Sequence, residues 1–196
     1  MIKITLKDGS VREYPDGTTI IEVAKSISHG LAKEVLAGKV NGKIVDVKFP
    51  LQEDAALELL TFNDEEGRAV YRHSSAHIMA QAVQKLFPEA KLAIGPAIQD
   101  GFYYDFDVPR PFTPAELEQI EAEMQRIIKA DLPFERVEVS RAEALEQFNK
   151  EGELYKVELI NDLPEDSVIS CYQQGEFNDL CAGPMCLPPD VLKALN

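Results

Sequence analysis

Two histidines and one cysteine are the residues of this sequence whose types and spacing most directly suggest chemistry. His73 and His77 stand four residues apart in YRHSSAH, and Cys181 stands much later, in FNDLCAGPMC. Imidazoles at this spacing on a helix can hold a divalent metal or clamp a polar substrate, although the spacing also arises by chance. A thiol close to an imidazole can act as a nucleophile. Metal binding, substrate binding and nucleophilic catalysis are therefore the chemistries to weigh.

These side chains can act together only if a helix and a distant segment bring them to one place. Residues from about 67 to 87 carry apolar side chains at helical spacing, which predicts a helix. Because successive helical residues are rotated by about 100°, His73 and His77 should lie side by side on one edge of the apolar stripe. The thiol ends VISCYQQGEFNDLC, a strand-like run. A helix and a strand are thus expected to position the site.

The composition describes a soluble, globular and acidic chain. Its 196 residues are 45% hydrophobic and 28% charged, enough to bury one medium core or two small ones. The formal net charge of -14 argues against a free-standing nucleic-acid binder, because phosphate contacts need clustered Lys and Arg. The sequence has no signal-type block and no run of roughly 20 apolar residues. We expect a cytoplasmic protein with no membrane contact.

The cysteines do not suggest a disulfide framework. Cys171, Cys181 and Cys186 are an odd number in a chain without a secretion signal, so thiols or metal ligands are expected instead. Cys171 lies within a strand pattern and is expected in the core.

The first module is expected to be a small sheet curled over one helix. MIKITLKDGSVREY alternates apolar and polar residues around an Asp-Gly turn, which predicts a hairpin. TTIIEVAKSISHGLAKEVLAG begins at a threonine cap and predicts a helix that is interrupted at His29-Gly30 and closed by Gly38. VNGKIVDV and ALELLTF supply three further strands. The module resembles a TGS domain, a ubiquitin-like β-grasp unit, over residues 1–62, most clearly in DGSVREYPDGTT.

The second module, residues 63–196, begins at the polar run NDEEGR. After the histidine-bearing helix, KLAIGPAIQDGFYYDFD predicts two strands, and a helix follows at about residues 113–130. FERVEVS predicts a strand, SRAEALEQFNKEG a capped helix, and LYKVELI a further segment before the run that ends at Cys181. The whole chain is therefore expected to be of the α+β class.

Four separated stretches of this module resemble the editing domain of threonyl-tRNA synthetases. They are RHSSAHIMAQAV, LAIGPAIQDGFYYDFD, LYKVELI and EFNDLCAGP, in family order and with family-like spacing. The resemblance implies a deacylase that hydrolyses the ester of serine wrongly attached to the threonine tRNA. The implied partner is the aminoacylated 3′ end of tRNA, and a synthetase catalytic domain could act with the module in cis or in trans.

The resemblance also assigns roles to residues of this chain. His73 and Lys156 would position and activate water, His77 and Cys181 would shape the pocket and donate hydrogen bonds, and Asp179 would bind the ammonium group of the aminoacyl moiety. Further pocket residues are implied near the substrate side chain: Tyr104, Gly95 and Pro96. The alternatives stay open, namely a core role for Tyr104 and an ordinary turn at the glycine and proline.

One position departs from the family pattern Cys-x-Gly-Pro-His. Met185 stands where that histidine is expected, and a methionine is neither a useful proton donor nor a good zinc ligand. A complete four-ligand zinc site is therefore not expected, and the resemblance implies hydrolysis that requires no metal or other cofactor. The alternative is a zinc set of His73, His77, Cys181 and Cys186. Catalysis by a nucleophilic Cys181 is a further alternative.

Two questions about the whole chain remain open at this point. No GxGxxR motif of the aminoacylating enzymes occurs, so the chain itself is not expected to charge tRNA. It is either the N-terminal portion of a synthetase or a free-standing paralogue. Instead of a deacylase, it could also be an inactive module that binds tRNA or a synthetase partner.

Overall fold

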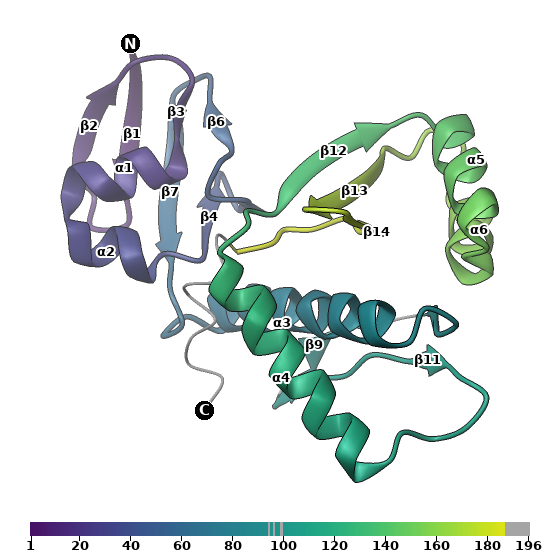
Figure 1. Ribbon diagram of the computed structural model, residues 1–196. Helices are drawn as coiled ribbons and strands as arrows, with labels where there is room; N and C mark the ends of the chain where they lie inside the picture. The colour runs from purple at the N-terminus through teal and green to yellow at the C-terminus, as the bar shows by residue number, and fades with distance from the viewer. Residues whose placement is uncertain (94, 96, 99, 187–196) are drawn as a thin grey trace. The chain divides into compact units, whose positions relative to one another are not determined.

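The computed structural model describes residues 1–93, 95, 97, 98 and 100–186. Their contacts divide the chain into two compact units. The first unit holds residues 1–72 together with residues 183–186, and the second holds residues 73–182. The expected α+β class is confirmed by the mixture of helices and sheets (Figure 1). The predicted boundary after residue 62 stays a prediction.

The first unit is a five-stranded sheet with two short helices on one face (Figure 1). Its strand order is β2-β1-β7-β4-β5, with β1 and β7 parallel. Its elements are β1 (Ile2–Leu6), β2 (Val11–Tyr14), β3 (Thr18–Thr19), α1 (Ile20–Ile27), α2 (His29–Glu34), β4 (Ala37–Val40), β5 (Lys43–Val45), β6 (Pro50–Leu51) and β7 (Ala55–Leu60).

Local sequence accounts for most of this unit. Thr19 caps α1 through a capping box with Glu22, as predicted. The Asn41-Gly42 pair adopts positive φ at both residues and joins β4 to β5. The buried apolar side chains of α1 pack against alternate residues of the strands, including Ile4 and Leu57. The core is therefore the space between one helix face and one sheet face.

The expected helix end at Gly38 is wrong. The helical segment ends at Glu34, and Gly38 lies in β4. A Cβ atom at Gly38 would lie 2.8 Å from the Ile20 side chain, so this glycine allows a strand to approach α1 closely and does not close a helix. The expected interruption near His29 is confirmed, because Ser28 ends α1 and caps α2.

The second unit surrounds the long helix α3 with short strands and further helices. Its elements are α3 (Glu65–Leu86, whose first turns belong to the first unit), β8 (Lys91–Leu92), β9 (Ala97–Ile98), β10 (Gly101–Phe102), β11 (Phe106–Asp107), α4 (Pro114–Ala130), β12 (Glu135–Val139), α5 (Arg141–Glu151), α6 (Leu154–Asp162), β13 (Ile169–Gln174) and β14 (Phe177–Leu180). The strands β12, β13 and β14 form an antiparallel sheet. Side chains of α5 and α6 pack with β13 in one apolar cluster.

Two strand predictions for this unit need correction. The run that ends at Cys181 is a hairpin of β13 and β14, because Gly175 has a positive φ at the turn. The described residues between Lys91 and Asp107 form four short strands, paired β8 with β11 and β9 with β10, and not two longer ones. The predicted helices near residues 67–87 and 113–130 are confirmed. Among the described residues, no helix is both long and apolar enough to cross a membrane.

Candidate functional site

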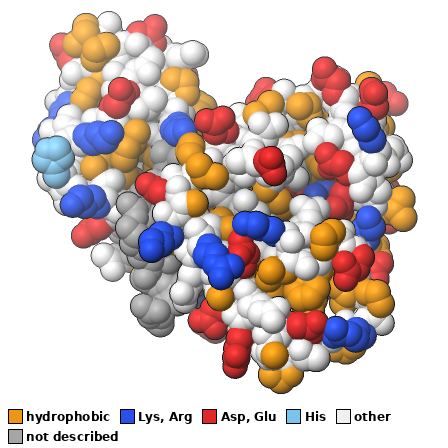
Figure 2. All heavy atoms as spheres, in the orientation of Figure 1, with side chains coloured by type: hydrophobic (Ala, Val, Ile, Leu, Met, Phe, Trp, Pro, Cys, Tyr) orange, Lys and Arg blue, Asp and Glu red, His pale blue; other side chains and the backbone are white. Residues whose placement is uncertain are grey.

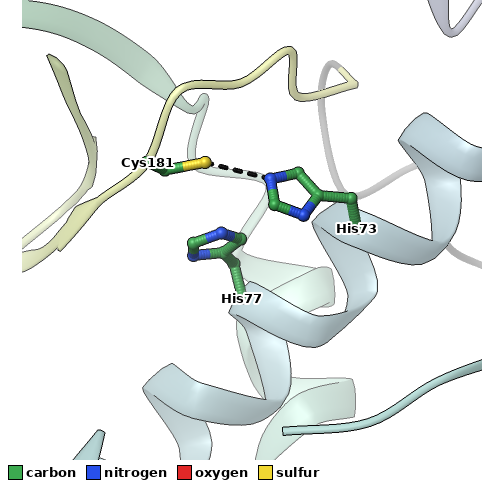
Figure 3. A group of neighbouring side chains, drawn as sticks. All are labelled: His73, His77 and Cys181. Atoms are coloured by element: carbon green, nitrogen blue, oxygen red, sulfur yellow. Dashed lines mark hydrogen bonds between the residues drawn. The ribbon is translucent and has the colours of Figure 1, made fainter. Parts of the chain in front are cut away.

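The site is built by α3 and by β14 with the residue that follows it. Histidines four residues apart on α3 contact residues two positions apart on this strand segment. His73 of α3 meets Cys181, and His77 meets Asp179. Four residues of a helix advance about 6 Å and two residues of a strand about 6.6 Å. A helix spacing of four and a strand spacing of two therefore keep the two rows in register. The two histidines come from one helix face and the thiol from the segment after β14 (Figure 3).

The thiol of Cys181 is held next to His73. Nε2 of His73 lies 2.9 Å from Sγ of Cys181, a hydrogen-bond distance. The backbone of Cys181 is fixed by two bonds with Ser170 of β13: its N–H donates to the Ser170 carbonyl, and its carbonyl accepts from the Ser170 hydroxyl. The position of this thiol is therefore set by the sheet and not by a free loop.

The surroundings of Cys181 favour its thiolate. Burial alone would raise the pKa of this thiol, but hydrogen bonds and charge from His73 and His77 lower it to about 6. The thiol of Cys171, by contrast, has a pKa raised to about 11 by burial. Cys171 is fully buried in the sheet core, as expected. At neutral pH the site thus holds one thiolate.

Asp179 is the buried centre of the polar network. Its Oδ1 lies 2.9 Å from Nζ of Lys156, which is itself buried. Its Oδ2 lies 2.8 Å from Nδ1 of His77, at an angle unlike that of a regular hydrogen bond, and accepts from the Tyr104 hydroxyl at 3.2 Å. Burial would raise the pKa of this carboxyl, but His77 and Lys156 hold it well below its usual range. Asp179 is therefore ionised.

His77 carries the compensating proton. Burial alone would lower the pKa of its imidazole, but contact with Asp179, and then with Cys181, raises it to about 10. Two cations, His77 and Lys156, thus stand against two anions, Asp179 and the Cys181 thiolate. A buried network with balanced charge avoids the desolvation cost of an unpaired ion.

Tyr104 closes one side of the site because Gly95 has no side chain. A Cβ atom at Gly95 would lie 2.1 Å from Cδ2 of Tyr104, a distance that no real contact allows. The ring also stacks on Phe106, with centroids 5.1 Å apart. Pro96, predicted as a pocket residue, lies outside the described residues. Gly95 therefore serves to admit the tyrosine ring against the backbone.

These residues line one cavity of about 260 Å³. It brings together seven of the eight residues singled out from the sequence as catalytic or substrate-binding: His73, His77, Gly95, Tyr104, Lys156, Asp179 and Cys181. Leu159 of α6 also lines the cavity and was missed. It follows Lys156 by three residues, so the helical spacing of LYKVELI is the signal that would have found it. The roles of these residues stay predictions.

Three of the cavity residues have the chemistry of a metal site. The ligand atoms of His73, His77 and Cys181 lie within 4.8 Å of one another. A carboxylate beside Nδ1 of a histidine, as Asp179 is here, is also common around zinc-bound imidazoles. These residues could hold a zinc ion, which would polarise a carbonyl or activate water. Whether one is needed stays a prediction.

The remaining member of the alternative zinc set, Cys186, belongs to the first unit, as does its neighbour Met185. Met185 and Cys186 are buried there. The backbone N–H of Met185 donates to Oδ1 of Asp46 at 2.7 Å. Burial raises the pKa of the Tyr71 hydroxyl, and the charge interaction with Cys186 raises it further.

The fold and the site together define a class of protein. A β-grasp unit is joined to an α+β unit, and the second unit contains a cavity lined by ion-paired side chains. The TGS domain model matches residues 2–61, so the resemblance of the first module is confirmed. The whole chain is similar to the N-terminal region of threonine–tRNA ligases.

Three curated relatives show the extent of this similarity. The threonine–tRNA ligase of Desulforamulus reducens is 74% identical over 195 residues, which are 100% of this chain and 31% of the relative. That of Acetivibrio thermocellus is 61% identical over 184 residues, 94% of this chain and 29% of the relative. That of Syntrophomonas wolfei is 60% identical over 195 residues, 100% of this chain and 31% of the relative. The chain thus spans about a third of the length of these relatives.

Proposed function

We propose that the second unit hydrolyses the ester bond of a mischarged aminoacyl-tRNA, specifically serine attached to the threonine tRNA. The observation that carries the proposal is the cavity itself, where a balanced set of His73, His77, Lys156, Asp179 and Cys181 surrounds a space of about 260 Å³. The names of the relatives, threonine–tRNA ligases, point to this tRNA. The partner proposed is therefore the aminoacylated 3′ end of tRNA, with a catalytic domain acting in cis or in trans.

The need for such a site follows from the size of the two amino acids. Serine differs from threonine by one methyl group, and one methyl in a pocket discriminates by only about 1–3 kcal/mol. A second pocket that admits serine and excludes the larger side chain multiplies the selectivity. The Tyr104 ring, fixed against Gly95, supplies a rigid wall of the kind that such exclusion requires.

Asp179 and Lys156 are proposed to orient the substrate. A carboxylate has about four lone-pair sites, so Asp179 can accept from a substrate ammonium group while it keeps Lys156 and His77. Lys156 lines the cavity from α6, where its ammonium group can stabilise the oxyanion that develops on the ester carbonyl and can hold water beside it.

His73 is proposed to take the proton from the attacking water. It is only partly buried, unlike His77, and it lines the cavity. The hydrogen bond to the Cys181 thiolate requires a proton on Nε2, which leaves Nδ1 as the acceptor in the neutral ring. His77 keeps its proton at neutral pH and serves as a fixed cation and hydrogen-bond donor. The departing ribose oxygen then takes up the proton.

A nucleophilic Cys181 is the alternative route, and its lowered pKa favours it. In that route the thiolate attacks the ester carbonyl, the ribose alcohol leaves with a proton, and water hydrolyses the thioester. Direct attack by water needs no such intermediate. Rapid quenching distinguishes the two, because only the covalent route accumulates serine on Cys181.

We propose that the reaction needs no metal. Two cations already balance the two anions of the network, and binding of zinc to Nε2 of His77 would convert a cation that Asp179 stabilises into a neutral ligand. Elemental analysis of the active protein, with hydrolysis measured before and after chelation, tests this point. A stoichiometric zinc content that activity follows would contradict it.

The deciding experiment for the function is ester hydrolysis of seryl-tRNA(Thr). The wild-type chain should hydrolyse it, and His73→Ala should lose at least about 100-fold in rate. Met185→His tests whether the residue at this position limits the rate. The second candidate is a module that binds tRNA or a synthetase without cleavage, which Met185 favours. Absence of hydrolysis by the wild-type chain at high concentration would select that candidate.

A further inference from the structure

A second cavity lies in the same unit, beyond the histidines along α3. It has a volume of about 340 Å³. Its walls come from the C-terminal half of α3, from Leu132 after α4, and from the turn that joins β13 to β14. The mechanism proposed above uses none of these residues.

The cavity is rich in hydrogen-bond acceptors. The Gln81 amide donates its NH₂ to the Gln174 carbonyl at 3.4 Å, and the Gln174 amide donates to the Leu132 carbonyl at 2.7 Å. These bonds fix the orientation of both amides. The side-chain oxygens of Gln81 and Gln174 are buried and have no hydrogen-bond partner among the described residues. Glu176 adds an exposed carboxylate at the turn.

Apolar surface and positive charge complete the cavity. Phe177 and Leu132 line it, and Leu132 is 44% exposed. Lys85, also in the lining, contacts one oxygen of Glu123 at 2.6 Å, while Arg126 contacts the other at 2.9 Å. Both cations are mostly exposed and the carboxylate is buried. Two cations that share one anion leave a local positive charge on an acidic chain.

The second cavity lies along α3 at a distance from His77 that the helix itself fixes. Lys85 follows His77 by eight positions, which is about 12 Å along the helix. A nucleoside and the phosphate that follows it span such a distance. A chain that enters with its ester at His77 can therefore place its next nucleotide here.

We infer that this second cavity binds an amino-bearing nucleotide of the substrate's 3′ end, and the inference rests on the proposed function. The base stacks against Phe177 and Leu132, and its exocyclic amine donates to the amide oxygens and to Glu176. The phosphate lies near Lys85 and Arg126. Cytosine and adenine carry such an amine, whereas uracil presents a carbonyl. The subsite therefore prefers cytidine over uridine next to the terminal adenosine.

Three seryl esters test the inference with the full chain: seryl-adenosine, and the trinucleotides CCA and UUA carrying serine at the 3′ end. We expect kcat/KM for the CCA ester to exceed that for the UUA ester by about 10-fold. Lys85→Gln should lower both trinucleotide rates by about 5-fold and leave seryl-adenosine unchanged. Lys150→Gln is the matched control, because Lys150 is exposed on α5 and does not line the cavity.

The outcomes separate the inference from the function. Equal rates for the three esters, unaffected by Lys85→Gln, would overturn the inference and leave the deacylase intact. Hydrolysis of none of them by the wild-type chain would reject the function and the inference together. Free cytidine monophosphate, added as an inhibitor, tests whether a single nucleotide binds in the second cavity. It should slow hydrolysis of the two trinucleotide esters and leave seryl-adenosine unchanged; inhibition of seryl-adenosine hydrolysis as well would place it at the histidines and contradict the inference.

Discussion

At the scale of single residues, the site depends on one carboxylate. Asp179 is buried and contacts a lysine, a histidine and a tyrosine at once. Each partner would be a buried donor or cation without compensation if the charge of Asp179 were lost. Structure and chemistry therefore rest on the same side chain.

Asp179→Asn should cost both stability and activity. The amide keeps the shape but removes the charge that His77 and Lys156 face, and breaking a buried ion pair costs about 3–5 kcal/mol. We expect a fall of that order in the free energy of unfolding, measured by denaturant titration. Ester hydrolysis should fall by more than about 100-fold. Asp107→Asn is the control, because Asp107 is exposed and accepts one hydrogen bond from Tyr155; an equal effect of both variants would contradict the prediction.

The Cys181 thiolate should make stability depend on pH. Its folded pKa of about 6 lies below the ordinary value of 9.0, so the unfolded chain binds more protons between these values. The stabilisation is therefore fully present above about pH 9 and is lost as pH falls through about 6. The difference in thiolate absorbance between wild type and Cys181→Ser should titrate with a midpoint near pH 6. A midpoint near 9 would show that the imidazoles do not stabilise the anion.

At the scale of elements, the segment after β8 and the segment before β11 form one cavity wall, through Ala93, Gly95 and Tyr104. Tyr104 lies between β10 and β11 and is held by stacking on Phe106. Gly95, three residues after β8, leaves room for that ring. The wall is therefore a contact between two segments that flank one strand pair, β8 with β11.

Gly95→Ala should disturb this wall. The added methyl group would lie 2.1 Å from the ring of Tyr104, and overpacking typically costs about 1–3 kcal/mol. Because a displacement of about 1 Å can cost 100-fold in rate, we expect hydrolysis to fall by at least about 10-fold. Gly101→Ala in β10 is the matched control, since its Cβ would meet nothing within 4 Å. Full activity of Gly95→Ala would contradict the prediction, because it would show that the Tyr104 ring can shift without harm to the cavity.

The sequence predicted those features that depend on local pattern. Thr113 and Ser140 cap α4 and α5, and both helices have capping boxes; the cap of α5 was predicted. The spacing of His73 and His77 also predicted correctly that they share a helix face. The acceptor pair of Gln81 and Gln174 was not predicted, because their contact joins distant parts of the chain and no periodicity signals it.

The positions of Lys156 and Asp179 came from family resemblance and not from pattern. A lysine in LYKVELI would ordinarily point to solvent, yet Lys156 is buried, with its ammonium group over the Phe148 ring and beside Asp179. The ion pair of Lys156 with Asp179 forms because α6 packs near β14 in the tertiary structure. The hairpin of β13 and β14 was read as one strand because QQGE gives only a weak turn signal.

At the scale of the whole molecule, charge decides how RNA can be bound. The chain has 34 acidic and 20 basic residues, and both kinds are interspersed over the face drawn in Figure 2. On the drawn face, acidic side chains lie among the basic ones, which does not favour an extended contact with a nucleic-acid backbone. Under the proposed function, contacts to tRNA would therefore be few and local, as the inferred contact at Lys85 and Arg126 is.

The affinity of this chain for uncharged tRNA should accordingly be weak and only mildly dependent on salt. Basic proteins bind nucleic acid non-specifically with Kd of about 10⁻⁴ to 10⁻⁶ M at physiological salt, with a slope set by the number of phosphates neutralised. With a net charge of -14, we expect a Kd above about 10⁻⁴ M and a slope corresponding to about two phosphates. Fluorescence anisotropy of labelled tRNA over a series of salt concentrations measures both quantities. Lys85→Gln should reduce the slope by about one, and Lys150→Gln should not. Micromolar binding with a steep slope would mean that this acidic chain presents a basic surface larger than the two cations around Glu123.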